Sequence, residues 1–154
     1  MHESPNLAII QHESDVMQVA NHYFENGIAY FTRRINRCIS MACANGEVAP
    51  FVGHNAFVRW KALQDAAFVD VHDKEAKARG EEKIWSESNV SEDFDMALRL
   101  LKRGYDIRWA TYSNGGFKEG VSLTVDDELN RWQKYAYGCN EYVLFRFFVR
   151  RYTG

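Results

Sequence analysis

Three carboxylates lie within four positions of the sequence, at Glu92, Asp93 and Asp95, directly after Ser91. Acidic side chains in the first turn of a helix interact favourably with the helix dipole, by about 0.3–1 kcal/mol each. Three acids are more than helix capping needs. Like charges held close together also cost energy, unless a ligand or cation compensates them. A carboxylate there can serve as a general base when a substrate hydroxyl comes within about 3 Å. From these residues alone, a capped helix and a reactive site both stay open.

The same cluster spells an Asp-x-Asp pattern at positions 93 and 95, of the kind that binds a divalent ion bridging to diphosphate oxygens. On a helix, positions i and i+2 point to different faces, so the two aspartates could not easily share one ion. His72 and Asp73 lie in a charged stretch, residues 70–83, without a second ligand pair nearby. That stretch is typical of a solvated loop or helical turn. We expect no metal site in this chain.

The composition is that of a globular chain able to bury one core, with 154 residues, 46% hydrophobic, 14% aromatic and 26% charged. The formal net charge of -2 gives no basic field of the kind that dominates nucleic-acid binding, so nucleic acid is not an expected partner. Three cysteines without a CxxC pair favour free thiols over a disulfide framework. We expect one domain, or part of one.

No signal peptide is predicted, because the first residues lack a basic start followed by a long apolar stretch. No membrane span is predicted either, because no window approaches the roughly 20 apolar residues that a span needs. The tail, residues 141–152, interleaves arginines with aromatic and aliphatic side chains. A segment of this kind can lie in a bilayer interface, or it can be a helix or strand packed on the core. Contact of the tail with a membrane surface is therefore one of two expectations.

The elements that must position the carboxylates follow from hydrophobic periodicity. Residues 6–12 are a short run of branched apolar residues, which predicts a buried strand with partners elsewhere in the chain. Apolar residues recur at helical spacing from about 16 to 44, and "NGEVAP" ends that helix. Gly27 lies inside this helix, where a break is possible. A second, short helix is expected from about Trp60.

The acidic cluster opens the clearest helix. Ser91 is the predicted N-cap, and Gly104 should end the helix with a left-handed residue. Residues 106–112 alternate toward a strand, which gives the helix, glycine turn and strand order of α/β folds. A last helix should start at Thr124 in a capping-box pattern and close at Gly138.

The segment "VSEDFDMALRLLKRGYDIRW" resembles the glutamate-aspartate motif of inverting family-2 glycosyltransferases, the group that includes cellulose, chitin and hyaluronan synthases. In that family, the aspartate that matches Asp93 is the catalytic base. The resemblance implies that Asp93 takes the proton from an acceptor sugar hydroxyl as that oxygen attacks the anomeric carbon of a nucleotide-activated sugar. Glu92 and Asp95 would then shape the substrate site around it, while Ser91 does the capping.

Two further segments resemble the family in the same order. "PFVGHNAFVRW" is similar to its acceptor-site strand, which implies that Gly53, His54 and Asn55 lie near the acceptor sugar. "DELNRWQKYAYG" resembles its Gln-x-x-Arg-Trp element, in which the arginine helps hold the diphosphate and the tryptophan stacks on the acceptor. Arg131 and Trp132 take those positions. Singly, each residue has an ordinary structural explanation, and it is the collinear set of three segments that favours the family.

The resemblance implies an α/β fold, a partial GT-A domain of the Rossmann-like, nucleotide-diphospho-sugar transferase type. Residues 1–154 would be its acceptor-side, C-terminal portion, without the N-terminal nucleotide-binding half. The closest members would be fungal and membrane-anchored, with the domain on the cytoplasmic side. Glu128 stands where the synthases carry glutamine, a departure that bears on processive polymerisation.

The implied partners are a nucleotide-sugar donor and a carbohydrate acceptor, bound by a longer parent protein. That parent would hold a divalent cation, Mg or Mn, and this chain alone none. The chain by itself is then expected to be inactive. The alternative is a truncated, non-catalytic remnant that binds a carbohydrate, or that pairs with a partner through an exposed sheet edge.

Overall fold

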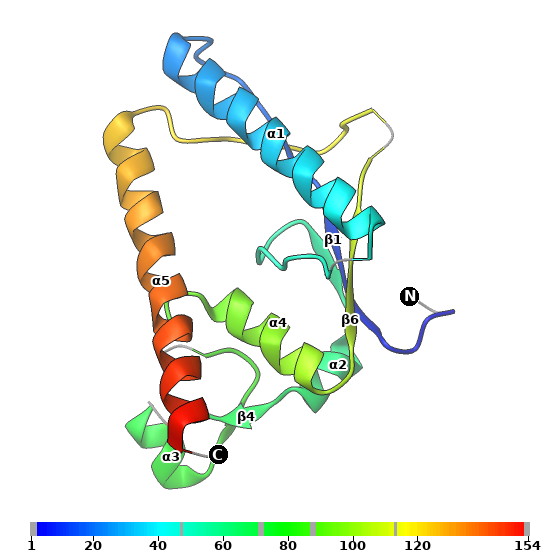
Figure 1. Cartoon of the computed structure of the whole chain (residues 1–154), viewed down its shortest axis with the longest axis vertical. Coiled ribbons are helices and arrows are strands. Elements are labelled where there is room, and N and C mark those ends of the chain that lie inside the picture. The colour runs from blue at the N-terminus through cyan, green and yellow to red at the C-terminus, as the bar shows by residue number, and fades with distance from the viewer. Residues whose placement is uncertain (1–2, 47, 71–72, 87–88, 113, 153–154) are drawn as a thin grey trace.

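A computed structural model describes residues 3–46, 48–70, 73–86, 89–112 and 114–152. The backbone of its last helix is described to Tyr152, and the side chains of that helix to Glu141. In Figure 1, β1 and β6 lie side by side, and α4 lies between these strands and α5. The three longest helices are α1, α4 and α5. This arrangement confirms the predicted α/β class.

The central sheet has the strand order β3-β1-β6. β1 (Leu7–His12) runs parallel to β6 (Asp106–Ala110) and antiparallel to β3 (Ala56–Val58). Ile9 is fully buried and pairs with both neighbouring strands. The predictions of a strand at residues 6–12 and of a strand after Gly104 are therefore confirmed, because burial on both sides suits β-branched residues.

Two short strand pairs extend this frame. β2 (Asp15–Val16) runs parallel to β7 (Lys118–Glu119). β4 (Phe68–Val69) runs antiparallel to β5 (Glu82–Lys83), with the six-residue helix α3 (Lys74–Arg79) between them. The first pair places Glu119 beside His54, in the loop before β3. The second pair is joined to α4 through Arg99, which contacts Phe68 and Ile84.

The helix α1 (Tyr23–Ala44) begins later than the periodicity predicted. Its N-cap is His22, whose Nδ1 accepts a hydrogen bond from the Glu25 N–H. The buried Glu25 carboxylate in turn accepts three backbone hydrogen bonds from the segment before the helix, at Val19, Ala20 and Asn21. These bonds fold the preceding residues into a loop, because they satisfy N–H groups that a longer helix would use. Gly27 does not interrupt the helix.

The helix α4 (Glu92–Lys102) ends as the sequence predicted. Gly104 has φ of 82°, and its N–H donates to the Leu101 carbonyl while the Tyr105 N–H donates to the Leu100 carbonyl. These two hydrogen bonds form a Schellman motif, which requires a residue with left-handed backbone at the position of Gly104. The start differs, because Ser91 occupies the N-cap position without a side-chain capping bond. The prediction that the Ser91 side chain does the capping is wrong.

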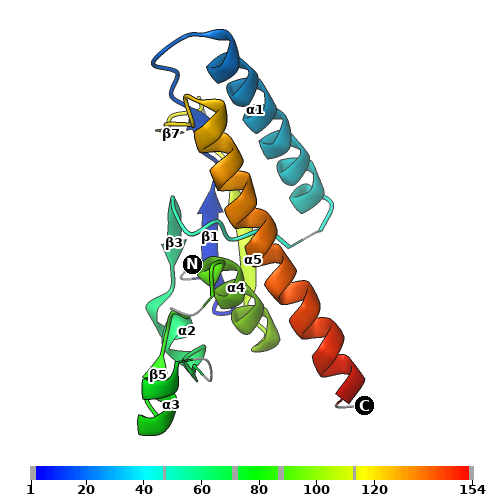
Figure 2. The same ribbon diagram turned by 90° about the vertical axis from the view of Figure 1, so that its left-hand side faces the viewer.

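The helix α5 (Val125–Tyr152) continues past Gly138, so the prediction that it closes there is wrong. An ideal Cβ on Gly138 would lie 2.9 Å from Ser91 Cβ, and closer still to its Oγ. The glycine therefore permits α5 to pack directly on the start of α4, as Figure 2 shows. Close packing of a small residue explains why a glycine stays inside a helix.

One hydrophobic core lies between the sheet, α4 and the short helix α2 (Trp60–Asp65), the latter as predicted. Its buried members are Ala8, Ile9, Ala49, Phe51, Ala62, Leu63, Ala66, Met96, Ala97, Leu100 and Ile107. None of the three cysteines, Cys38, Cys43 and Cys139, forms a disulfide bond. Within the described ranges, no helix is long and apolar enough to cross a membrane. The side chains of tail residues 142–152, proposed to contact a membrane, lie outside those described.

Candidate active site

The loop that joins Phe51 to β3 is anchored by a buried amide. Gln11, on the central strand, is fully buried. Its Oε1 accepts the Val52 N–H at 3.0 Å, and its Nε2 donates to the His54 carbonyl at 2.8 Å. Because a buried amide left unpaired costs about 1–3 kcal/mol, these bonds fix the loop. The sequence analysis missed Gln11, although a polar residue within an apolar strand is a usable signal.

Two residues of this loop have left-handed backbone. Gly53 has φ of 82° and Asn55 has φ of 50°, a region that glycine and asparagine tolerate best. The Asn55 amide donates to the His12 carbonyl at 3.2 Å and to Ser14 Oγ at 3.0 Å. Asn55 therefore holds the loop against the end of β1.

The Asp93 carboxylate lies against Gly53. An ideal Cβ on Gly53 would lie 2.6 Å from Asp93 Oδ1, and closer still to Oδ2. Real Cβ atoms essentially never approach another atom so closely. The glycine thus opens the space that the carboxylate occupies, and two of the three resembling segments meet at this point.

The surroundings of Asp93 change its proton affinity. Burial raises its pKa, and the neighbouring Glu92 raises it further, while His54 and Lys134 lower it. The net pKa lies above the ordinary aspartate value. A helix dipole favours the ionised form of a carboxylate in the first turn, but burial and the neighbouring Glu92 outweigh that effect on the pKa of Asp93. Asp93 is accordingly a stronger base than an exposed aspartate.

A pocket of about 530 Å³ lies in front of Asp93. Its lining combines residues of the loop, the segment before α4 and the first turn of α4: Gly53, Trp85, Ser86, Asn89, Glu92 and Asp93. The resemblance supplied Gly53, Glu92 and Asp93, and gave no role to the other three. A tryptophan and an asparagine a few residues before an acidic helix start would have been the signal for them.

Asp95 forms an ion pair outside this pocket. It pairs with Arg99 one turn along α4, with Arg99 Nε at 2.7 Å from Asp95 Oδ2. The same guanidinium donates to the Ile84 carbonyl and lies 4.1 Å from the centre of the Phe68 ring. Asp95 therefore helps fasten the β4 and β5 segment to α4, and it does not line the Asp93 pocket.

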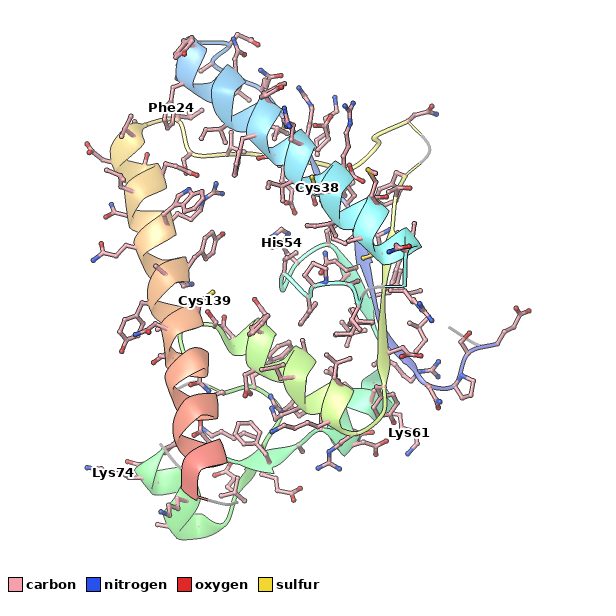
Figure 3. The ribbon with its side chains drawn as sticks, in the orientation of Figure 1. Phe24, Cys38, His54, Lys61, Lys74 and Cys139 are labelled. Atoms are coloured by element: carbon pink, nitrogen blue, oxygen red, sulfur yellow. The ribbon has the colours of Figure 1, made fainter. Side chains whose placement is uncertain are left out.

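A second pocket of about 450 Å³ is lined by three more of the predicted residues, His54, Arg131 and Trp132. Asn55 lines neither pocket. His54 lies in its wall, and Figure 3 shows this residue on its loop between α1 and α4. His54 Nδ1 lies 2.7 Å from Glu119 Oε1, which ties the loop to β7. Arg131 and Trp132 line the same pocket from α5. The residues at 53 and 54 thus face two different pockets.

Glu128 organises the α5 side of this second pocket. Its carboxylate accepts hydrogen bonds from Arg131 at 2.9 Å and from Trp132 Nε1 at 2.7 Å. Burial alone would raise the pKa of Glu128, but hydrogen bonds from Arg131, Ser122 and Trp132 outweigh burial and lower it. The Trp132 ring lies 6.1 Å from that of Phe31 on α1. A carboxylate at 128 thus fixes both the arginine and the tryptophan that follow it.

Metal ligands do not gather in the described part of the chain, where no three His, Cys, Asp or Glu side chains come together in a suitable group. Asp73 lies 2.6 Å from Lys83 Nζ, and His72 lies outside the described residues. Asp93 and Asp95 are separated by their different contacts. The described side chains therefore do not fit a divalent-cation site.

Comparison with known proteins gives one match. The sequence model of the family described as glycosyl transferase family group 2 matches residues 1–154. No curated protein and no solved structure matches the chain significantly. The family match covers all three resembling segments and identifies no subtype within the family.

Proposed function

Because the chain belongs to glycosyl transferase family group 2, we propose that it forms the acceptor-side part of a domain that transfers a sugar, with inversion, from a nucleotide-diphosphate donor to a carbohydrate hydroxyl. Its small mixed sheet and surrounding helices fit part of a GT-A glycosyltransferase domain. The observation that carries the proposal is the meeting of Asp93 with Gly53 at a pocket.

Asp93 is the general base of this reaction. Its carboxylate takes the proton of the acceptor hydroxyl while that oxygen forms a bond to the anomeric carbon of the donor sugar. The bond from that carbon to the diphosphate oxygen breaks, and the nucleotide diphosphate leaves with the electron pair. A pKa raised by burial supports this role, because proton transfer is most effective when the base has a pKa nearer the working pH.

Arg131 supports the reaction on the donor side, and Trp132 lies beside it in the second pocket. The guanidinium would contact the donor diphosphate, since arginine suits bidentate binding of phosphate oxygens. Their shared partner Glu128 holds both side chains in place within the second pocket. His54, paired with Glu119, joins the two pockets through the backbone of Gly53.

Several finer expectations stay predictions. These are a synthase-like or fungal subtype, a membrane-associated parent with this domain on its cytoplasmic side, and a Mg or Mn ion in that parent. The described side chains of this chain form no group that could hold such a cation. A non-catalytic chain that binds a carbohydrate or a partner remains the alternative function.

The test is sugar transfer by the intact protein, meaning the longer parent protein that contains this chain. It is incubated with a panel of nucleotide-diphosphate sugars and neutral tetrasaccharide acceptors, and NMR follows the anomeric configuration of the new bond. We expect a product whose configuration is inverted relative to the donor. Retention of configuration would contradict the single-displacement mechanism, and absence of transfer from every donor would favour the non-catalytic alternative.

A further inference from the structure

Trp85 presents a fixed aromatic surface to the pocket in front of Asp93. Its ring stacks on that of Phe51, with ring centres 6.3 Å apart and planes at 28°. Phe51 belongs to the buried core, whereas Trp85 remains 38% exposed. The core thus holds one part of the indole, and the rest is available to a ligand. A tryptophan fixed in this way loses little conformational freedom when a ligand packs against it.

Asn89 lines the same pocket, and it is the last of three side chains that are linked by hydrogen bonds. Ser86 Oγ donates to the carboxylate of Asp70 at 3.1 Å, and Asn89 Nδ2 donates to Ser86 Oγ at 2.8 Å. Asp70 is 1% exposed. Because a carboxylate accepts hydrogen bonds, the serine proton points to Asp70, and the serine oxygen then accepts from the amide. These hydrogen bonds therefore orient the Asn89 side chain, with its nitrogen toward Ser86 and its carbonyl oxygen away from Ser86.

The pocket offers hydrogen-bond acceptors and an aromatic surface. Its acceptors are the carboxylates of Glu92 and Asp93 and the carbonyl oxygen of Asn89, and no lysine or arginine is among its described lining residues. Hydroxyl groups are donors that satisfy such acceptors, whereas a phosphate or carboxylate would be repelled. The apolar C–H face of a pyranose ring packs well on an aromatic ring. The volume of about 530 Å³ is in the range of small-molecule sites.

We infer that this pocket is the subsite for a neutral acceptor saccharide, in which Trp85 stacks on the sugar ring and Asn89 accepts a hydrogen bond from a sugar hydroxyl. The inference rests on the proposed function, since the acceptor hydroxyl must reach Asp93. It differs from what the resemblance implies, which gives the stacking role to Trp132. Trp132 lies in the other pocket, against Phe31, and its indole N–H is bound by Glu128.

The test is calorimetric titration of the full chain with cellotetraose, chitotetraose and the anionic tetragalacturonate. We expect a neutral tetrasaccharide to bind and tetragalacturonate to bind at least about tenfold more weakly, because of Glu92 and Asp93. Trp85→Leu should weaken the neutral ligand by about tenfold, the usual scale for a lost aromatic contact. Asn89→Ala should weaken it by about threefold to tenfold. The matched control is Trp60→Leu, an exposed tryptophan on α2 outside both pockets, which should leave binding unchanged.

Three results would overturn the subsite. They are absence of binding of both neutral ligands by the wild type, unchanged binding by folded Trp85→Leu and Asn89→Ala variants, and loss of binding on Trp132→Leu alone. Circular dichroism and thermal melting establish which variants are folded. Asn89→Ala removes no core contact, so it tests the inference even where Trp85→Leu fails to fold.

Kinetics of the intact protein separate this inference from the proposed function. Trp85→Leu should raise the acceptor KM by about tenfold with a smaller effect on kcat, whereas Asp93→Asn should lower kcat and keep acceptor binding. Normal transfer by Asp93→Asn, with binding lost in Trp85→Leu, would contradict the base and retain the subsite. The converse pair of results would contradict the subsite and retain the base.

Discussion

The carboxylate of Asp93 occupies space that only a glycine at position 53 leaves empty. An ideal Cβ on Gly53 would lie 2.6 Å from Asp93 Oδ1, so the two positions constrain one another across 40 residues of sequence. The backbone adds a second requirement, because φ of 82° at Gly53 disfavours L side chains. The loop and the first turn of α4 therefore form one unit, on which the proposed chemistry depends.

Gly53→Ala should destabilise the chain by about 2–4 kcal/mol, from the left-handed backbone and the overlap with Asp93 together. The displaced carboxylate should also lower transfer by about 100-fold, the effect expected of a misplacement near 1 Å. Urea denaturation and the transfer assay measure the two effects. The matched control is Gly27→Ala on α1, where a Cβ meets nothing within 4 Å. That change should stabilise by about 0.5–1 kcal/mol, and equal losses in both variants would contradict the account.

Asp93→Asn should raise stability at neutral pH. The folded-state pKa of Asp93 lies above its ordinary value, because burial and Glu92 disfavour the charge. This lowers the free energy of unfolding as the pH rises from the ordinary aspartate pKa to the higher folded-state pKa, and the cost is absent at acid pH, where the group is protonated in both states. The gap between variant and wild type should therefore widen from about pH 3 to pH 7. Thermal melts across this range measure it, and a constant gap would argue against a raised pKa.

Glu25→Gln should behave in the opposite way. Hydrogen bonds from the Val19, Asn21 and Ala20 N–H groups outweigh burial and lower the pKa of Glu25, with His22 adding a smaller effect. The ionised carboxylate therefore stabilises the fold above its ordinary pKa, and this stability is lost as the pH falls through the lower folded-state value. The variant should be less stable than wild type at pH 7, with the difference shrinking below about pH 5. A variant as stable as wild type at pH 7 would contradict the role given to this buried acid.

Helices and strands whose bounds are determined by residues within the same segment could be predicted from the sequence. The strand at residues 6–12 and the end of α4 follow from branched residues and from Gly104. The start of α1 could not, because Glu25 captures N–H groups before the helix. The continuation of α5 through Gly138 depends on Ser91, 47 residues earlier, and periodicity carries no information on such a contact.

The same limit applied to the site. Motif resemblance assigned Gly53 and Asp93 to one substrate site, and the two residues lie against each other in the structure. The resemblance could not divide the remaining residues between two pockets. His54 and Trp132 face one pocket, while Trp85 and Asn89 face the other beside Asp93. The residues are divided between the two pockets because the loop before β3 places Gly53 beside α4 and His54 in the pocket that α5 lines. That packing is fixed by Gln11 and other buried groups outside the motifs.

Gly138→Ala should destabilise the chain although alanine favours helices. The gain in helix propensity of about 1 kcal/mol is outweighed by overlap of the new Cβ with the Ser91 side chain. We expect a net loss of roughly 1–2 kcal/mol in chemical denaturation. Ser91→Gly in the same chain should restore most of that loss, because glycine is tolerated at an N-cap. Additive effects of the two substitutions would show that α5 and α4 do not touch at this point.

The most direct measurement of the central claim is kcat for sugar transfer by wild type and Asp93→Asn in the intact protein, with the acceptor Kd determined for both. Asp95→Asn, in the same turn but paired with Arg99, is the control. The account predicts that Asp93→Asn lowers kcat by about 10²–10⁴-fold, the usual contribution of a general base, while the acceptor Kd changes little. Asp95→Asn should keep kcat near that of wild type. Transfer by Asp93→Asn at a near-normal rate would contradict the assignment of the base.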